Sequence, residues 1–165
     1  MIPMNAQSNP SRSHRGFTLI EMMITIAVAA ILMAIVVPSF RTFTLSQRVK
    51  SGSFDLYSTL MLARSEAVKR RATVTVAASA ANWNNGWTIS DGTTTLRTQD
   101  TPKGLTITSD QTTLTYQLDG RVGSGSASYL QLAATGSTAA GMRCMTVDPA
   151  GVPRSRVLGA SETCP

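Results

Sequence analysis

The chain carries Arg15-Gly16-Phe17-Thr18-Leu19-Ile20-Glu21 directly before an apolar stretch, Met22 to Val37, in which no side chain is charged. Together with the four residues that follow Gly16, this stretch approaches the ~20 residues that an α-helix needs to cross a bilayer. Pro38 closes the stretch. The sequence therefore predicts a transmembrane helix over residues 17–40.

The residues before the apolar stretch predict its orientation. Arg12, His14 and Arg15 precede it, and no acidic residue occurs before Glu21. This bias favours a cytoplasmic N-terminus and places the bulk of the chain on the outer side of the membrane. An ordinary secretory signal is the alternative, but it fits poorly because the apolar core is long, ends without a small-residue cleavage site and has a carboxylate near its start.

Glu21 is unusual because an ionised carboxylate at the edge of the hydrocarbon is costly unless it reaches the headgroups or finds a cation. One interpretation is that Glu21 extends to the headgroups. The other is that the chain is cut between Gly16 and Phe17, which frees an α-amino group four residues before Glu21. That amino group would neutralise the carboxylate in a neighbouring copy.

Gly16, Phe17, Glu21 and Pro38, with the apolar run between them, resemble the class III signal of type IV pilins and type II secretion pseudopilins. The resemblance implies cleavage after Gly16 by a prepilin peptidase, N-methylation of Phe17 and a role for Glu21 in recruiting a subunit into a growing filament. Residues 1–16 are then a removed leader, and residues 17–40 are a transmembrane and assembly helix.

Residues 41–71 contain no proline and predict a long amphipathic helix with two apolar stripes. The first stripe is Leu45, Val49, Leu56, Leu60, Ala63 and Ala67. The second stripe, roughly 100° further round by the 3.6-residue period, is Phe43, Phe54, Tyr57, Met61 and Val68. Either one stripe covers the chain's own sheet while the other meets neighbouring subunits, or both form one wide core face.

After Arg71 the apolar residues alternate and turn signals separate the segments, so residues 72–165 predict a β-rich head. The expected strands are 72–78, 87–90, 94–98, 105–109, 113–118, 129–133, 143–147 and 154–158. Leu62 to Arg71, Gly86-Trp87, Asp119-Gly120-Arg121 and Arg143-Cys144 resemble the H-type pseudopilin (GspH) and FimT/FimU minor pilin family. The resemblance implies an α+β fold, in which the helix packs on two antiparallel sheets, and a low-copy subunit near a filament tip.

Composition excludes most enzyme classes. The 165-residue chain has a formal charge of +6, but residues 72–165 hold six basic and six acidic residues, so any nucleic-acid site there must be local. The one histidine, His14, lies in the leader, so the mature chain has no imidazole for a catalytic triad or a metal site. Paired carboxylates and a Gly-rich phosphate loop are also missing from the sequence. We expect no enzyme activity, no catalytic residue, no cofactor and no metal.

Cys144 and Cys164 are the only cysteines, and outside the cytoplasm such a pair most simply forms a disulfide. Their spacing excludes a CxxC redox pair, and too few other ligands exist for a metal site. A loop of about 20 residues corresponds to roughly 3 kcal/mol of stabilisation. The disulfide would hold the C-terminal tail on the sheet.

Arg154 and Arg156 lie two residues apart inside this loop, so on a strand both guanidinium groups would point to the same face. FimT-type proteins include DNA receptors for natural transformation with a Gly-Arg-x-Arg hairpin in this tail, and here Gly151 stands two residues further from the Arg-x-Arg pair. One interpretation is therefore a phosphate-binding DNA site, which Arg121 and Arg143 would extend if the fold brings them close. The other is that both arginines solubilise the strand or pair with Asp148 and Glu162. The run at residues 69–71 likewise either contacts phosphates or caps the helix dipole.

The sequence thus predicts a single-pass inner-membrane protein with a cytoplasmic N-terminus and a periplasmic head. Its expected function is that of a minor pilin or pseudopilin of a type IV pilus or type II secretion pseudopilus, with DNA uptake through Arg154 and Arg156 as the alternative. The expected partners are the prepilin peptidase, other minor and major pilins or pseudopilins, the inner membrane and, in the alternative, DNA.

Overall fold

A computed structural model describes residues 16–159 and 162–164, with the backbone alone at residues 138 and 139. The chain divides into two compact units, residues 1–38 and 39–165. The elements are α1 (Leu19–Arg70), β1 (Val74–Ala78), η1 (Ser79–Ala81), η2 (Trp83–Asn85), β2 (Trp87–Ser90), β3 (Thr95–Gln99), β4 (Leu105–Ser109), β5 (Thr113–Tyr116), β6 (Tyr129–Ala134), β7 (Ser137–Val147) and β8 (Pro153–Leu158).

The helix α1 is one continuous element that covers both predicted segments, 17–40 and 41–71, and is the long N-terminal helix of the predicted fold. Pro38 lies inside α1 and does not end it. Proline removes one backbone donor, and the remaining hydrogen bonds carry the helix past it. The helix ends where Arg71 adopts a left-handed conformation with φ of 52°. The Ala72 N–H then donates to the Ala67 carbonyl at 3.2 Å, which satisfies a terminal acceptor of the helix.

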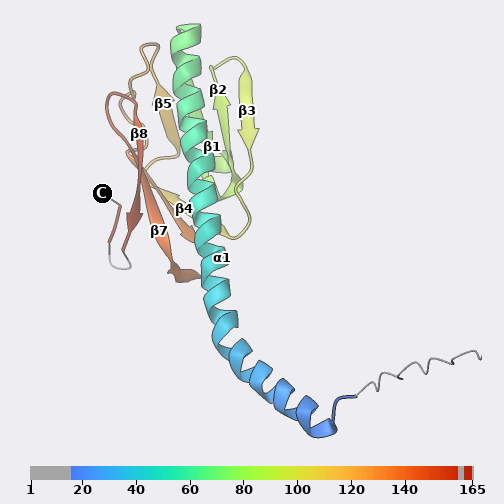
Figure 1. Cartoon of the computed structure of the whole chain (residues 1–165). Helices are drawn as coiled ribbons and strands as arrows, with labels where there is room; N and C mark the ends of the chain where they lie inside the picture. The colour runs from blue at the N-terminus through green and yellow to red at the C-terminus, as the bar shows by residue number, and fades with distance from the viewer. Residues whose placement is uncertain (1–15, 160–161, 165) are drawn as a thin grey trace, which may run out of the picture. The chain divides into compact units, whose positions relative to one another are not determined.

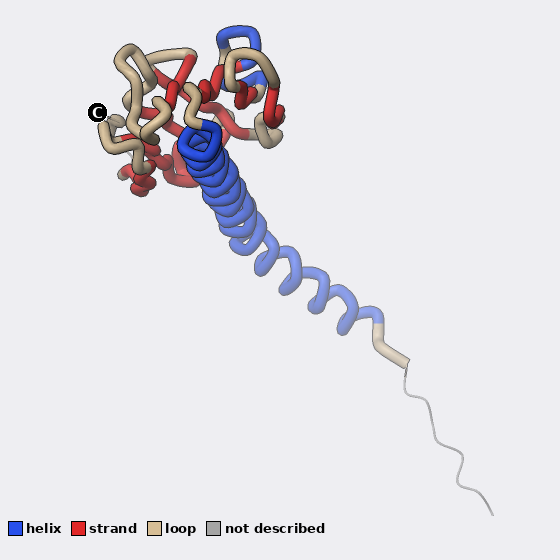
Figure 2. The backbone as a smooth tube through the Cα atoms, turned by 90° about the horizontal axis from the view of Figure 1, so that it is seen from above, coloured by secondary structure: helices blue, strands red, loops and turns tan. Residues whose placement is uncertain are grey.

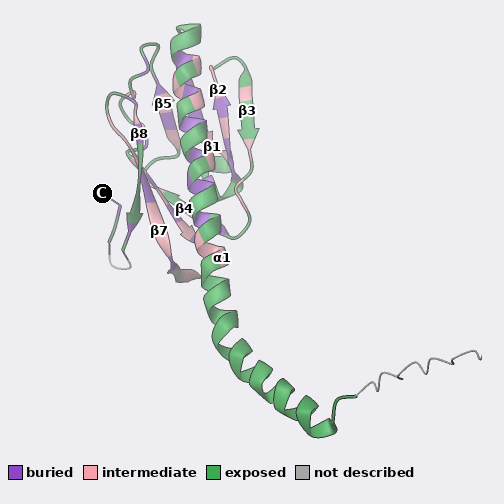
Figure 3. Ribbon diagram, viewed as in Figure 1, coloured by how far each residue is buried: buried purple, intermediate pink, exposed green. Residues whose placement is uncertain are grey.

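The part of α1 that belongs to the head buries one stripe of side chains. Its buried residues are Val49, Gly52, Ser53, Leu56, Thr59, Leu60, Ala63 and Ala67, and Leu45 packs partly buried against them. The second predicted stripe stays outside the core: Phe54 is 63% exposed and Tyr57 is 37% exposed. The alternative of one wide core face is therefore wrong, as Figure 3 shows along the helix.

In the described part of the chain the strands form two antiparallel four-stranded sheets. Their orders are β3-β2-β1-β5 and β4-β6-β7-β8. Figure 1 shows the head part of α1 with β2 and β3 on one side and β7 and β8 on the other, and Figure 2 shows the same helix from above, against the strands of the head. This is the two-sheet α+β architecture that the sequence predicts. All eight predicted strands are present; two of them, 87–90 and 105–109, have the predicted ends, and the ends of the others shift by at most six residues.

The short 3-10 helices η1 and η2 between β1 and β2 were not predicted, because the sequence indicates only a turn there, at Asn84-Asn85-Gly86. They position Asn84, whose side-chain oxygen accepts a hydrogen bond from the Ile107 N–H of β4 at 2.7 Å. They also seat Trp83, whose indole N–H donates to the Gln111 carbonyl at 2.8 Å. Asn84 therefore covers part of the outer edge of β4, which would otherwise expose unpaired backbone groups.

The core lies between α1 and both sheets. The indole N–H of Trp87, on β2, donates to the buried Thr59 hydroxyl at 3.2 Å. On the other side Gly52 lies so close to β4 that a Cβ atom there would collide with Leu105, and Leu132 of β6 is the next neighbour. A glycine in the middle of α1 is unfavourable for the helix itself, but here it allows the helix to approach the sheet.

Candidate functional site

The start of α1 contains a reciprocal capping arrangement between Thr18 and Glu21. The Thr18 N–H and hydroxyl donate to Glu21 Oε2 at 2.8 and 2.9 Å, and the Glu21 N–H donates to Thr18 Oγ1 at 3.3 Å. This is a capping box, in which a Thr and a Glu three residues apart satisfy each other's free backbone donors. The T-x-x-E spacing is the sequence signal for this cap, and the interpretation of Glu21 as a charge alone did not predict it.

The predicted processing site lies at the boundary of the described residues. Gly16 and Phe17 are both exposed and precede the first turn of α1. Residues 1–15 of the predicted leader, with Arg12, His14 and Arg15, lie outside the described residues. What the structure adds is that Glu21 already has partners within its own chain.

Arg154 and Arg156 lie on β8 with exposed side chains. Ser155 between them hydrogen-bonds the Ser53 hydroxyl of α1 at 3.0 Å, so the two arginines point to the opposite face of the sheet. Arg154 forms an ion pair with Asp148 at 3.6 Å, and Arg156 donates to the Thr163 carbonyl at 3.5 Å. The structure thus brings both arginines to one face and gives each a partner in the chain.

Arg143 does not extend this pair into a larger patch. Arg143 lies opposite Val157 in the β7–β8 register and lines, with Ser155 and Tyr57, a hollow of about 270 Å³ on the helix side of the sheet. Arg121 is exposed on the turn before Val122, where its N–H donates to Asp119 Oδ1 at 3.0 Å. The expected extension through Arg143 is therefore wrong, because residues 143 and 144 alternate between faces.

The structure joins Cys144 of β7 to Cys164 of the tail in a disulfide, the pairing that the sequence predicts. Both cysteines are buried together with Leu158 in a small apolar cluster. Glu162, which was considered as a partner for the arginines, accepts a hydrogen bond from the Gly159 N–H at 2.9 Å. The tail is thus fixed to the face of the sheet that carries Arg154 and Arg156.

The basic end of α1 is neutralised by acidic side chains. Arg70 contacts Glu66 at 2.6 Å and Asp91 at 3.1 Å, and Lys69 lies 3.7 Å from Glu66. The hydrogen bond from Arg70 lowers the pKa of Glu66. Hydrogen bonds from the Thr94 N–H, then from Thr93, lower the pKa of Asp91 to about 2. Two of the three cations of the run at residues 69–71 therefore belong to a structural network.

Arg64 is a residue whose role sequence reasoning missed. Its Nε donates to the Gly120 carbonyl and its Nη2 to the Ala150 carbonyl, each at 3.1 Å. One guanidinium group thus holds two turns, from different sheets, against α1. Tyr116 is fully buried, and this burial raises the pKa of its hydroxyl. Only the fold brings these turns together, so no local sequence signal identifies Arg64.

The described residues contain no group of three or more His, Cys, Asp or Glu side chains that could hold a metal ion. Residues 55–151 match the protein family described as Type II transport protein GspH, and residues 11–37 match the prokaryotic N-terminal methylation motif. The GspH match covers more than half of the chain.

The chain belongs to the GspH family.

Two crystal structures of the type IV minor pilin FimU from Pseudomonas aeruginosa strain PAO1 resemble this GspH-family protein. One is 25% identical, with a TM-score of 0.58, and covers 73% of this chain and 95% of FimU. The other is 26% identical, with a TM-score of 0.54, and covers 68% of this chain and 94% of FimU. No curated protein sequence matches the chain. The protein is a membrane-anchored, pilin-like structural subunit and not an enzyme.

Proposed function

We propose that this GspH-family protein is a minor pilin or pseudopilin that enters a type IV pilus or type II secretion pseudopilus near its tip. It is inserted in the inner membrane with a cytoplasmic N-terminus and a periplasmic head. Residues 1–16 are the leader, residues 17–40 the transmembrane and assembly segment, residues 41–71 the helix that packs on the head, and residues 72–165 the β-rich head. Its partners are the prepilin peptidase and other pilins or pseudopilins.

The observation that carries this proposal is the exposed apolar first half of α1 next to the methylation motif. Every described residue from Gly16 to Phe43 is exposed, although the stretch is among the most apolar of the chain. So much apolar surface needs lipid or other subunits to cover it. The match of residues 11–37 to the N-terminal methylation motif supports processing between Gly16 and Phe17 before assembly.

Glu21 is proposed to guide the incoming subunit through its charge, and the capping box makes this testable. Glu21→Gln keeps a residue that can cap Thr18 but removes the charge, whereas Thr18→Ala removes the hydroxyl cap and keeps the charge. We expect Glu21→Gln to lower the amount of the protein in sheared filaments about tenfold or more. Thr18→Ala should retain most of it.

The control is the amount of each variant in the membrane, which should be equal. Normal incorporation of Glu21→Gln together with loss in Thr18→Ala would show that Glu21 acts as a helix cap only. Normal incorporation of both variants into filaments would show that Glu21 has no role in assembly.

A second candidate is DNA binding for uptake. The observation that favours it is that Arg154 and Arg156 are both exposed on one face of β8. The detergent-solubilised chain would be titrated with a short duplex at ~50 and ~200 mM salt. A phosphate site would give binding that weakens sharply with salt and is lost in Arg154→Ala/Arg156→Ala. The matched double variant Arg97→Ala/Arg143→Ala should bind normally, because Arg143 lies on the other face of the sheet. Absence of binding at low salt would exclude this candidate.

A further inference from the structure

The first turns of the head helix form a cationic segment without acids. Residues 39–54 contain Arg41, Arg48 and Lys50 and no Asp or Glu. Lys103 joins them from the loop between β3 and β4, because its neighbour Gly104 lies against Arg48, whose Nη1 is 3.2 Å from the place of a Cβ on Gly104. All four cations are exposed. We call Arg41, Arg48, Lys50 and Lys103 the basic collar.

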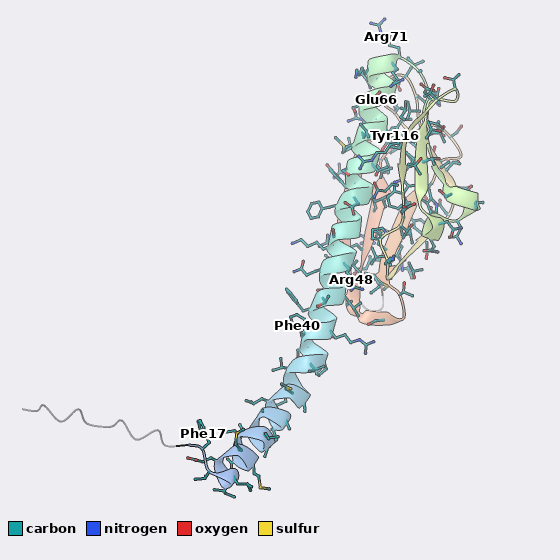
Figure 4. All side chains as sticks on the ribbon, turned by 90° about the vertical axis from the view of Figure 1, so that its right-hand side faces the viewer. Phe17, Phe40, Arg48, Glu66, Arg71 and Tyr116 are labelled. Carbon is teal, nitrogen blue, oxygen red and sulfur yellow. A yellow bond between two sulfur atoms is a disulfide. The ribbon has the colours of Figure 1, made fainter. Side chains whose placement is uncertain are left out.

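The basic collar differs from the cations at the other end of the helix in its lack of partners. Lys69 and Arg70 form ion pairs with Glu66 and Asp91. Within the described residues, no ion pair joins any collar cation to a carboxylate. Figure 4 shows Arg48 at one end of the head helix, with Glu66 and Arg71 at the other. The collar charge is therefore available to an external anion.

The position of the collar in the chain indicates what that anion is. Arg41 stands three residues after Pro38, where the apolar run ends, and Lys50 twelve residues after it. At ~1.5 Å per residue these cations occupy the first ~18 Å beyond the run. The headgroup region of a leaflet accounts for roughly 6 Å of this distance, and screening at physiological salt acts over about 8 Å more. Arg41 therefore lies among the headgroups, whereas Arg48 and Lys50 lie at the outer limit of the field of the leaflet.

The arrangement around the helix also suits a lipid surface. Arg41 and Arg48 are seven residues apart and share one face, whereas Lys50 is nine residues from Arg41 and lies on the opposite side. Exposed Phe40 and Phe43 stand next to them, and apolar side chains beside cations are typical of segments at the membrane interface. Charges on both sides suit a helix that rises out of the headgroup layer.

We propose that the basic collar binds the anionic phospholipid headgroups of the leaflet from which the head emerges. The contact holds the head at the membrane surface before assembly and is broken when the subunit leaves the bilayer. The proposal depends on the membrane anchor and is independent of filament position. Lipid headgroups and nucleic acids both present phosphate groups. The collar follows the apolar run directly in the chain, and this favours a lipid over a nucleic acid as its ligand.

The test uses the full mature chain in phosphatidylcholine bilayers with trace spin-labelled phosphatidylglycerol or phosphatidylcholine. Electron spin resonance reports the motionally restricted fraction of each lipid at the protein surface. We expect phosphatidylglycerol to be preferred about threefold over phosphatidylcholine, and this preference to fall toward one at ~0.5 M salt. The variant Arg41→Gln/Arg48→Gln/Lys50→Gln/Lys103→Gln should lose the preference.

The matched control is Arg71→Gln/Arg97→Gln/Arg121→Gln/Arg143→Gln, which removes the same charge elsewhere on the head and should keep the preference. Equal restriction of both lipids by the wild-type chain would overturn the proposal while leaving the anchor intact, whereas no restricted lipid at all would refute the anchor itself. If both variants lost the phosphatidylglycerol preference equally, the preference would depend on net charge alone, and the collar would not be a specific site. Salt-sensitive binding of a DNA duplex to the collar without lipid preference would assign the site to nucleic acid.

Discussion

The two halves of α1 are both rich in apolar residues, but they differ in where those residues lie on the helix. In the first half, apolar side chains face every direction, and all described residues up to Phe43 are exposed. In the second half, one stripe with helical spacing is buried against two sheets, and the exposed side carries polar residues together with the second apolar stripe, which includes Phe54 and Tyr57. A helix that is apolar on all sides suits lipid or a surrounding bundle, whereas a single stripe suits a sheet.

The two halves of one helix therefore suit two different environments. The first half adds no core to the chain and depends on other molecules to cover it. The second half obtains its core from the head, through Leu56, Leu60 and the neighbours of Gly52. Substitutions should therefore affect the stability of the head only when they fall in the second half and on the buried stripe.

The largest effect is expected when matched leucines are truncated in the two halves. Leu56→Ala should destabilise the head by about 2–5 kcal/mol, because it leaves a cavity in a fully buried site. Leu32→Ala removes the same atoms from an exposed position in the first half and should leave the head unchanged. Thermal unfolding of both variants in detergent checks this, and similar shifts would contradict the division of α1.

Loss of the disulfide should have the next largest effect. Cys144→Ser and Cys164→Ser should each lower the stability of the head by roughly 3 kcal/mol, since the disulfide closes a loop with a sequence separation of 20. The double variant should equal either single variant, because both remove the same bond. An unchanged Tm under oxidising conditions would show that the disulfide does not stabilise the head.

A larger side chain at the close contact between α1 and β4 should have the third largest effect on the stability of the head. Gly52→Val should destabilise the head by about 1–3 kcal/mol, because the new side chain collides with Leu105. The neighbouring Ser51→Val lies on the exposed side of α1 and should have almost no effect. A tolerated Gly52→Val would mean that helix and sheet separate easily at this point.

The pH dependence should be small and confined to acid. The pKa of Asp91 is lowered to about 2 from an ordinary 3.8, so its contribution is complete above pH ~4 and disappears as the pH falls through ~2. Asp91→Asn should lower the Tm by a few degrees at pH 6, and this difference should vanish near pH 2. Asp100→Asn, in an exposed loop, serves as the control, and a pH-independent difference for Asp91→Asn would exclude the charge as the cause.

The smallest effect is expected on the exposed stripe. Phe54→Ser should change the stability of the head by less than about 0.5 kcal/mol, because the ring is 63% exposed. Its incorporation into filaments should fall if this stripe meets neighbouring subunits. Unchanged stability and unchanged incorporation together would leave the stripe without a role in assembly.

Much of this molecule is predictable from local patterns. The apolar run, the buried stripe and the eight strands follow from period and turn chemistry, which depend on neighbouring residues only. The contacts of Arg64 with Gly120 and Ala150 could not be predicted, because they join residues 56 and 86 positions apart. The faces of the sheet on which Arg143 and Arg154 lie could be assigned only once the β7–β8 register was known. The exposure of Phe54 could be assigned only once the positions of the two sheets were known.

The central claim is that this chain is processed as a pilin and then enters a filament. The most direct measurement is the N-terminal residue of the protein recovered from sheared filaments and from membranes, determined by sequencing and mass spectrometry. The account predicts N-methylated Phe17 in both fractions. A chain that retains residues 1–16 in the membrane, or that never appears in the filament fraction, would contradict it.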